Sequence, residues 1–206
     1  MIWKVHPSTP QKQVVARIAD GLKRGEIFIA PTDTVYAFIC LLDAPKAISA
    51  LYEIKRIPEK QHLSLLCRDV AMASHYAHGI TNNVFRFMKS HTPGPYTFIL
   101  NAGRDMDRRG TGKKKEVGVR IVDHPLHFAL MELLDLPLIS TSIIQEDEYN
   151  TDPEYLDRQF GKKICAVIDD GIRKNEYSSV LDCTDGTLKV VRKGKGDVSS
   201  LESEED

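Results

Sequence analysis

The stretch APTDTVYAFICLL, which runs from Ala30 to Leu42, joins two apolar segments through a polar corner. Pro31 ends the apolar run EIFIA, which has the short, bounded pattern of a buried strand. Thr32, Thr34 and Tyr36 follow before the chain turns apolar again. Because Gly, Asn or Asp would be enough for a simple turn, these hydroxyl groups indicate a role beyond reversing the chain.

Helical and strand patterns alternate on both sides of this corner. Apolar residues at helical spacing predict helices over 8–25, 43–56, 81–91, 124–136 and 152–161. Short apolar or alternating runs predict strands over 26–30, 63–67, 96–100, 116–122, 137–142, 163–171, 177–183 and 187–194. We expect Ser8 or Thr9 to cap the first helix, Asp43 the second and Thr81 the third. The mixture predicts one α/β (α+β) domain over residues 1–198 with a central mixed sheet, and an acidic flexible tail over 199–206.

Composition narrows the class of protein. The 206 residues are 42% hydrophobic and 28% charged, which is typical of one soluble globular domain. A formal charge of -1 argues against a protein that grips nucleic acid mainly through its backbone. The four cysteines are scattered, so neither zinc nor a disulfide framework is expected. With no signal-peptide pattern and no run long enough to span a bilayer, we expect a cytoplasmic protein without a membrane partner.

Common motifs of nucleotide and hydrolase sites are missing from the sequence. The segment GTGKKK lacks the first glycine and the final Ser or Thr of a Walker A loop, and no GxGxxG, GxSxG or HExxH pattern occurs. No Ser-His-Asp or Cys-His arrangement is evident. We therefore expect a site that works by positioning and charge neutralisation, without a covalent nucleophile, a bound metal or a tightly held cofactor.

Four polar clusters lie at the ends of predicted strands and helices: the corner itself, KRIPEK (55–60), STSII (140–144) and YSSVLD (177–182) followed by Arg192. Taken one at a time, each has a local explanation. Such hydroxyl groups usually form hydrogen bonds with nearby backbone groups. Lys55 and Arg56 are favourable at a helix C-terminus, and Lys113–Lys115 are typical of a solvated loop. Together they can converge on one concave site, where hydroxyl groups contact neutral polar groups and cations neutralise phosphate.

Arg120 is harder to explain locally, because it interrupts the apolar strand VGVRIV. A charged group in a half-buried strand costs stability unless it is paired. We expect Asp123 or an acidic ligand to be its partner.

With PTDTVYA, KRIPEK, TPGPYTFIL, VGVRIVDHPL, PLISTS and YSSVLD…VVRKG in this order, the chain resembles the YrdC/YciO family over nearly its whole length. The resemblance implies a twisted mixed sheet that curves around one large open cavity, with helices outside. Active members are threonylcarbamoyl-adenylate synthases. L-threonine and bicarbonate give N-carboxythreonine, which attacks the α-phosphate of ATP with the help of Mg²⁺, and pyrophosphate leaves. Transfer proteins then pass the threonylcarbamoyl group to adenosine in tRNA.

The resemblance also implies roles for single residues. Thr32 and Ser178 fall where the family holds threonine, and Lys55 falls on the lysine that meets the ATP phosphates. Lys55 and Arg120 are the residues expected to be catalytic. The nucleotide is expected to contact Lys55, Arg56, Thr97, Arg120, Ser140, Ser142 and Arg192. Asp33 and Thr34 are expected to fix the corner by local hydrogen bonds, and Tyr36 to pack as a wall.

Departures from the pattern of active synthases place the sequence nearer the YciO branch. Ile57 replaces the second cation of the Lys-any-Arg pattern. The family's basic or polar residue before the next strand is Gln61 here, and Ile143 and Ile144 replace Ala-Asn after STS. Ala37 replaces a common glycine. One lost cation contact costs roughly 1.5 to 3 kcal/mol, or ten- to a hundredfold in affinity or rate.

Three functions therefore stay open at the level of sequence. The chain is a synthase, which Ile57 and Ile144 would weaken; or it binds double-stranded RNA or tRNA; or it adenylates another carbamate or acyl group. One local feature of the sequence favours RNA binding: a basic segment made of Arg104, Arg108, Arg109 and Lys113–Lys115.

Overall fold

A computed structural model describes residues 1–59, 61, 63–108, 115–143, 152–173 and 176–202. Within these residues lies one sheet of eleven strands. The strands are β1 (Ile2–Lys4), β2 (Phe28–Ala30), β3 (Ala37–Leu41), β4 (Ser64–Leu66), β5 (Ala77–His78), β6 (Tyr96–Ala102), β7 (Glu116–Arg120), β8 (Leu138–Ser142), β9 (Ala166–Asp169), β10 (Ser179–Asp182) and β11 (Lys189–Arg192). Their spatial order is β1-β9-β2-β3-β8-β4-β7-β6-β10-β11, with β5 beside β6.

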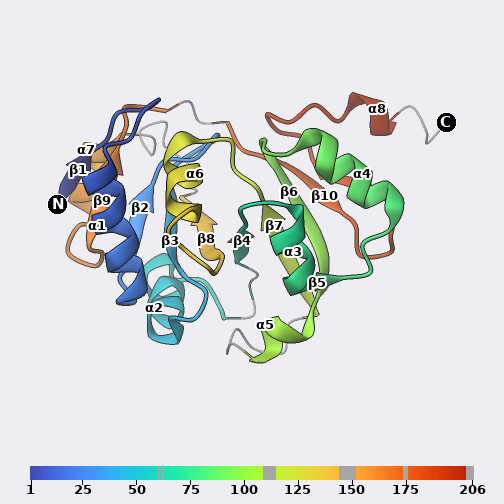
Figure 1. Cartoon of the computed structure of the whole chain (residues 1–206), viewed down its shortest axis with the longest axis horizontal. Coiled ribbons are helices and arrows are strands. Elements are labelled where there is room, and N and C mark those ends of the chain that lie inside the picture. The colour runs from blue at the N-terminus through green and yellow to red at the C-terminus, as the bar shows by residue number, and fades with distance from the viewer. Residues whose placement is uncertain (60, 62, 109–114, 144–151, 174–175, 203–206) are drawn as a thin grey trace.

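Helices connect these strands and lie in both halves of the molecule (Figure 1). They are α1 (Lys12–Lys23), α2 (Pro45–Lys55), α3 (Val70–Tyr76), α4 (Asn82–His91), α5 (Arg104–Arg108), α6 (Pro125–Met131), α7 (Pro153–Phe160) and α8 (Ser199–Glu202). Figure 1 shows α1, α2 and α6 in the half of the molecule that holds the N-terminus, α3 and α4 in the other half, and α5 at the lower edge near the middle. In the described part of the chain, no helix combines the length and apolar character needed to cross a bilayer.

The sheet is mixed, as predicted. Parallel pairs such as β4–β7 and β6–β10 alternate with antiparallel pairs such as β3–β8 and β6–β7. The sequence patterns did not predict β1, β5, α3 or α5, which are short, and they marked β3 only as an apolar stretch after the corner. The segment expected to be a flexible tail from residue 199 begins instead with α8, and Leu201 packs against the core. Residues 203–206 lie outside the described residues.

Two predicted helix caps are wrong, and one is confirmed. Gln11 and Ala44 are the N-caps of α1 and α2, and neither makes a side-chain capping bond. The backbone N–H groups of Ser8 and Thr9 donate to His6 Nδ1 at 3.3 and 3.1 Å, so these residues form a local turn before the helix. For α2, Pro45 sets the first turn and leaves Asp43 outside it. Thr81 caps α4 as expected, since Val84 N donates to Thr81 Oγ1 at 3.4 Å.

One face of the sheet is apolar across its width. Strand register aligns Cys40, Ile139, Leu65, Val119 and Phe98 on five neighbouring strands. All five are buried and belong to one core cluster, which includes residues of α2, α3 and α4. Because side chains alternate along a strand, the residues between them point to the opposite face.

That opposite face changes character along the sheet. Over β2, β3 and β8, α1 and α6 cover it: Ile18 and Leu130 pack in one cluster with Phe28, Ile39 and Leu138. Beyond β8, the aligned residues include Ser140, Ser64 and Gly118, which are small, and β6 and β10 there show alternating burial. We call this part, from β8 to β11, the open face. On this face lie Ser64, Thr97, Ile99, Gly118, Arg120, Ser140, Ser142, Val180, Asp182 and Arg192, with Ser178 beside Thr97. Arg120, Ser140 and Ser178 are buried within it.

Candidate functional site

A chain of hydrogen bonds holds the corner between β2 and β3. Thr32 Oγ1 donates to Val35 O at 2.6 Å and accepts from Thr34 N at 3.1 Å. The two threonine hydroxyl groups are 3.0 Å apart, so Thr34 donates to Thr32. Thr32 is fully buried, and its one proton and both lone pairs are used within the corner. The expectation that Thr32 faces a substrate cavity is therefore not met in this structure, where it is a scaffold residue.

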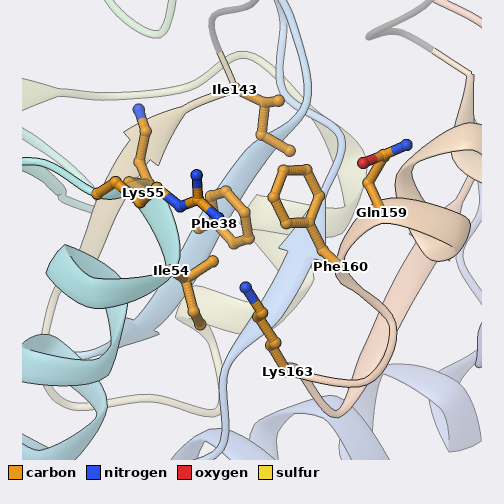
Figure 2. Close-up of a pocket in the computed structure, with 8 residues that line it drawn as sticks. Phe38, Ile54, Lys55, Ile143, Gln159, Phe160 and Lys163 are labelled. Atoms are coloured by element: carbon orange, nitrogen blue, oxygen red, sulfur yellow. The ribbon is translucent and has the colours of Figure 1, made fainter.

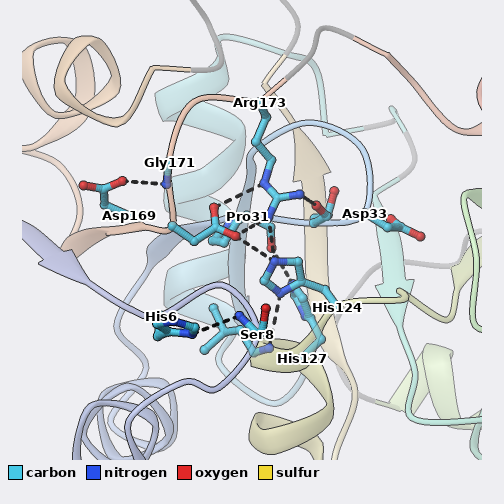
Figure 3. A network of polar contacts seen from close by, with 12 residues as sticks. His6, Ser8, Pro31, Asp33, His124, His127, Asp169, Gly171 and Arg173 are labelled. Atoms are coloured by element: carbon cyan, nitrogen blue, oxygen red, sulfur yellow. Dashed lines mark hydrogen bonds and ion pairs between the residues drawn. The ribbon is translucent and has the colours of Figure 1, made fainter.

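The corner's backbone carbonyls are held from three distant parts of the chain (Figure 3). His127 Nε2 of α6 lies 2.9 Å from Pro31 O. Arg173 Nη1, from the segment after β9, donates to Thr32 O at 2.6 Å. Lys195 Nζ, from beyond β11, donates to Asp33 O at 2.6 Å. These long-range contacts, which the sequence patterns did not predict, fix the corner against the rest of the domain.

Asp170 is the centre of the network that positions Arg173. Its carboxylate pairs with Arg173 and with His124 Nε2, the latter at 2.8 Å, and Tyr36 donates to Asp170 Oδ1 at 3.0 Å. Although burial opposes ionisation, the hydrogen bonds from His124 and Arg173 hold the pKa of Asp170 below its ordinary value. Tyr36 is wholly buried, and burial raises its pKa, so it acts as a neutral donor here.

Arg120 is buried and paired with Asp33, which corrects the expected partner, Asp123. Arg120 Nη2 donates to Asp33 Oδ1 at 2.7 Å and to Thr34 Oγ1 at 3.1 Å. Asp123 contributes only its backbone N–H, 3.3 Å from Asp33 Oδ2. Burial lowers the pKa of Arg120, the Asp33 carboxylate opposes this shift, and the nearby charge of Arg192 adds to it. Arg120 Nε is buried and has no hydrogen-bond partner among the described residues.

Thr97, Ser178 and Arg192, which we expected to contact ligands, lie close together on the open face. The hydroxyl groups of Thr97 and Ser178 are 2.8 Å apart, and Arg192 Nη2 donates to Ser178 O at 2.8 Å. Register aligns Arg192, Val180 and Thr97 on three adjacent strands. Ser140 and Ser142 lie on the same face of β8, with Ser140 aligned with Ser64 of β4. The structure thus brings six predicted residues, Arg120 included, to one face of the sheet.

Lys55 reaches the end of β8 from the last turn of α2. Its ammonium donates to Thr141 Oγ1 at 2.9 Å and to Ser142 O at 2.6 Å. Partial burial lowers the pKa of Lys55. Thr141 points to the apolar face and Ser142 to the open face, because they are consecutive in a strand. Lys55 therefore lies at the boundary between the two faces of the sheet.

Arg56 follows Lys55 as the C-cap of α2, in the left-handed conformation with φ 53°. Consecutive residues within a regular helix point to different sides of it. Instead, both residues line one pocket, because the left-handed cap redirects the chain. Ile57 is half-buried and packs against the core, so the position of the missing cation is used for packing.

Other residues of interest lie beyond the described ranges. Ile144, Arg109, Lys113 and Lys114 are among them, so the structure does not address the replaced amide or most of the basic segment. In the part of the chain that is described, His, Cys, Asp and Glu nowhere form a group of three or more that could hold a metal ion.

Two pockets flank the site. One, of about 420 Å³, lies between α2 and α7 and is lined by Phe38, Ile54, Lys55, Arg56, Ile143, Gln159, Phe160 and Lys163 (Figure 2). The other, of about 330 Å³, borders the corner and is lined by Pro7, Asp33, Thr34, Asp170, Ile172, Arg173, Glu176 and Lys195. Sequence patterns singled out neither Arg173, Lys195 nor Lys163. The one signal for Lys195 is its place between two glycines in RKGKG.

Comparisons with known proteins agree with this architecture. The Sua5/YciO/YrdC family model, described as telomere recombination, matches residues 20–194. The uncharacterized protein YciO of Escherichia coli K12 is 34% identical over 197 residues, which cover 94% of this chain and 95% of YciO. The crystal structure of E. coli YciO superimposes with a TM-score of 0.88 and covers 97% of this chain and 98% of that one.

Two further relatives have named activities or ligands. A threonylcarbamoyl-AMP synthase of Serratia proteamaculans is 29% identical over 157 residues, which cover 75% of this chain and 83% of the synthase. The structure of P. abyssi Sua5 complexed with L-threonine has a TM-score of 0.87 at 24% identity and covers 98% of this chain and 60% of that one. The second likeness is one of fold.

Proposed function

This chain belongs to the Sua5/YciO/YrdC family, and we propose that it forms threonylcarbamoyl-AMP from L-threonine, bicarbonate and ATP, for modification of tRNA. The observation that carries the proposal is the convergence of hydroxyl groups and cations on the open face. Thr97, Arg120 and Arg192 come from three separate strands, and Ser178 directly precedes a fourth, β10. Arg120 is paired with Asp33, whereas Arg192 has no carboxylate partner among the described residues.

The proposed reaction needs no protein nucleophile. Threonine and bicarbonate form a carbamate with loss of water, and one carbamate oxygen attacks the α-phosphorus of ATP. The bond between that phosphorus and its bridging oxygen breaks, and pyrophosphate leaves with the electron pair. Charge grows on the phosphate oxygens, and we expect Arg120, Arg192 and Lys55 to neutralise it. Mg²⁺ enters with ATP as part of the substrate.

The corner supplies rigidity to this arrangement. Asp33 and Thr34 hold Arg120 on the open face, while Thr32 holds Thr34. The pocket of about 330 Å³ beside the corner offers both carboxylate and cationic side chains. An amino acid carries both charges, so we assign threonine to the region between this pocket and Ser178. Thr32 would then act through the corner it stabilises.

A pyrophosphate-release assay tests the proposal. The protein is given ATP, Mg²⁺, bicarbonate and each amino acid in turn, and threonylcarbamoyl-AMP is identified by mass spectrometry. Threonine should give the largest signal, and Lys55→Ala should reduce it roughly ten- to a hundredfold, because one charged contact to the phosphates is lost. Lys46→Ala, at the exposed start of the same helix, is the matched control and should leave the rate unchanged.

Other outcomes separate the alternatives. A larger signal with another amino acid would assign a different carbamate to the same site. No signal with any amino acid, together with RNA binding that weakens steeply as salt is added, would replace the synthase with an RNA-binding function.

A further inference from the structure

The pocket between α2 and α7 has a pronounced positive charge. Lys55 and Arg56 come from the end of α2, and Lys163 comes from the turn after α7. Among the described residues, no residue that lines the pocket is acidic, and none of these three cations has an ion pair with a carboxylate. Three like charges around one cavity repel one another unless an anion occupies it.

The pocket's other walls strengthen any charge interaction within it. Phe38 and Ile143 are 1% and 2% exposed, and the ring of Phe160 packs edge-on against Phe38 with centroids 5.0 Å apart. Figure 2 shows Lys55 on the α2 side and Lys163 on the α7 side of this aromatic pair. Apolar walls lower the local dielectric, so a cation beside them attracts an anion more strongly than a fully solvated one.

This pocket is separate from the open face, but the two meet at Lys55. Phe38 is aligned with Thr141, and both point to the apolar face of the sheet, opposite Ser140 and Ser142. Lys55 Nζ contacts Thr141 Oγ1 on one side and the Ser142 carbonyl on the other. A ligand that extends from the open face past the end of β8 would therefore pass Lys55 and enter the pocket.

We propose that the pocket between α2 and α7 binds a phosphoanhydride, with Lys163 and Gln159 as recognition residues that the sequence patterns did not single out. The ligand is free pyrophosphate or the terminal phosphates of a nucleoside triphosphate. The chemistry fits: two linked phosphates carry several negative charges for three cations, and the Gln159 amide offers a neutral donor. A volume of about 420 Å³ lies in the range of small-molecule sites.

This pocket assignment rests on the proposed function in one respect: pyrophosphate is the leaving group of that reaction. In that reaction, Lys163 in the turn after α7 supplies a positive charge that Ile57, two residues beyond α2, does not supply. The binding itself requires no turnover and can be measured alone.

Calorimetric titration of the full-length protein provides the test, with inorganic pyrophosphate, ATP and AMP as separate probes. Lys163→Ala should weaken binding of pyrophosphate and ATP about tenfold or more, because one charge-assisted contact is lost. AMP, which has no phosphoanhydride, should bind the variant as it binds the original chain. Lys162→Ala is the matched control: its lysine is exposed, adjacent and not part of the pocket lining. Lys163→Arg should restore most of the affinity.

The titrations with pyrophosphate and with ATP distinguish the two possible ligands. If Lys163→Ala weakens both pyrophosphate and ATP, the pocket recognises the phosphoanhydride itself; if it weakens only ATP, the pocket serves the nucleotide's tail. Equal affinities in the Lys163→Ala and Lys162→Ala variants for both probes would overturn the inference. If binding depends on Lys163 but no threonine-dependent turnover is found, the phosphoanhydride site stands and the proposed synthase function falls. If turnover is found but binding does not depend on Lys163, the synthase function stands and the phosphoanhydride site falls.

Discussion

The buried pair of Arg120 and Asp33 shows how much depends on a single residue at this site. Their side chains are 4% and 6% exposed, and no solvent screens their attraction. The unfavourable cost of burying Arg120 was foreseeable from the sequence, because a charge interrupts an apolar strand. Its partner was not, because Asp33 lies 87 positions earlier and only the fold brings the two together.

Arg120→Ala should lower the free energy of unfolding by about 3–5 kcal/mol, because it leaves the Asp33 carboxylate buried with only the Asp123 N–H. Arg68→Ala is the comparison, since Arg68 forms an exposed pair with Asp69 and should lose at most about 1 kcal/mol. Urea unfolding followed by circular dichroism measures both. Similar losses for the two arginines would show that the Asp33 pair contributes no more than a surface pair.

At the scale of elements, helix starts were the least predictable feature. Ser8, Thr9 and Asp43 all have side chains that commonly cap helices. The chain uses none of them for that purpose, because the His6 ring takes the N–H groups of Ser8 and Thr9 and Pro45 sets the start of α2. Competing local contacts of this kind leave little trace in the hydrophobic periodicity from which helices are predicted.

Thr81 differs because it connects two elements. It caps α4 and its hydroxyl donates to Gly186 O at 2.7 Å, before β11. Thr81→Ala should therefore cost about 0.5–2 kcal/mol of unfolding free energy, and Ser8→Ala should stay within about 0.5 kcal/mol. Chemical denaturation of the two variants beside the original chain decides the matter. A loss at Ser8 equal to that at Thr81 would mean that the turn before α1 has a capping role after all.

At the scale of the whole molecule, the mixed sheet and the family were predictable from the sequence, whereas the placement of side chains was only partly so. Polar residues at strand ends correctly pointed to one surface, since Thr97, Ser178 and Arg192 meet there. The scaffold role of Thr32 and the pocket beside Lys163 were not predictable. They follow from packing between segments far apart in the chain, which periodicity does not encode.

Bound ligands should stabilise the domain as a unit. In bicarbonate-free buffer, where no carbamate can accumulate, ATP with Mg²⁺ at a hundred times its Kd should stabilise the folded state by about 2.7 kcal/mol and raise the Tm by about 5–11 °C. Threonine should act in the same way. If the two ligands share one site across the open face, each should change the affinity of the other by the same factor, as linkage requires.

Variants assign each ligand to its part of the molecule. Lys55→Ala should remove most of the ATP-dependent shift in Tm and keep the threonine-dependent one, because Lys55 lies at the end of β8 and not at the corner. Lys46→Ala should keep both shifts. An ATP-dependent shift that survives in Lys55→Ala would place the nucleotide away from the boundary between the open face and the α2–α7 pocket, and the arrangement proposed for the phosphates would have to be abandoned.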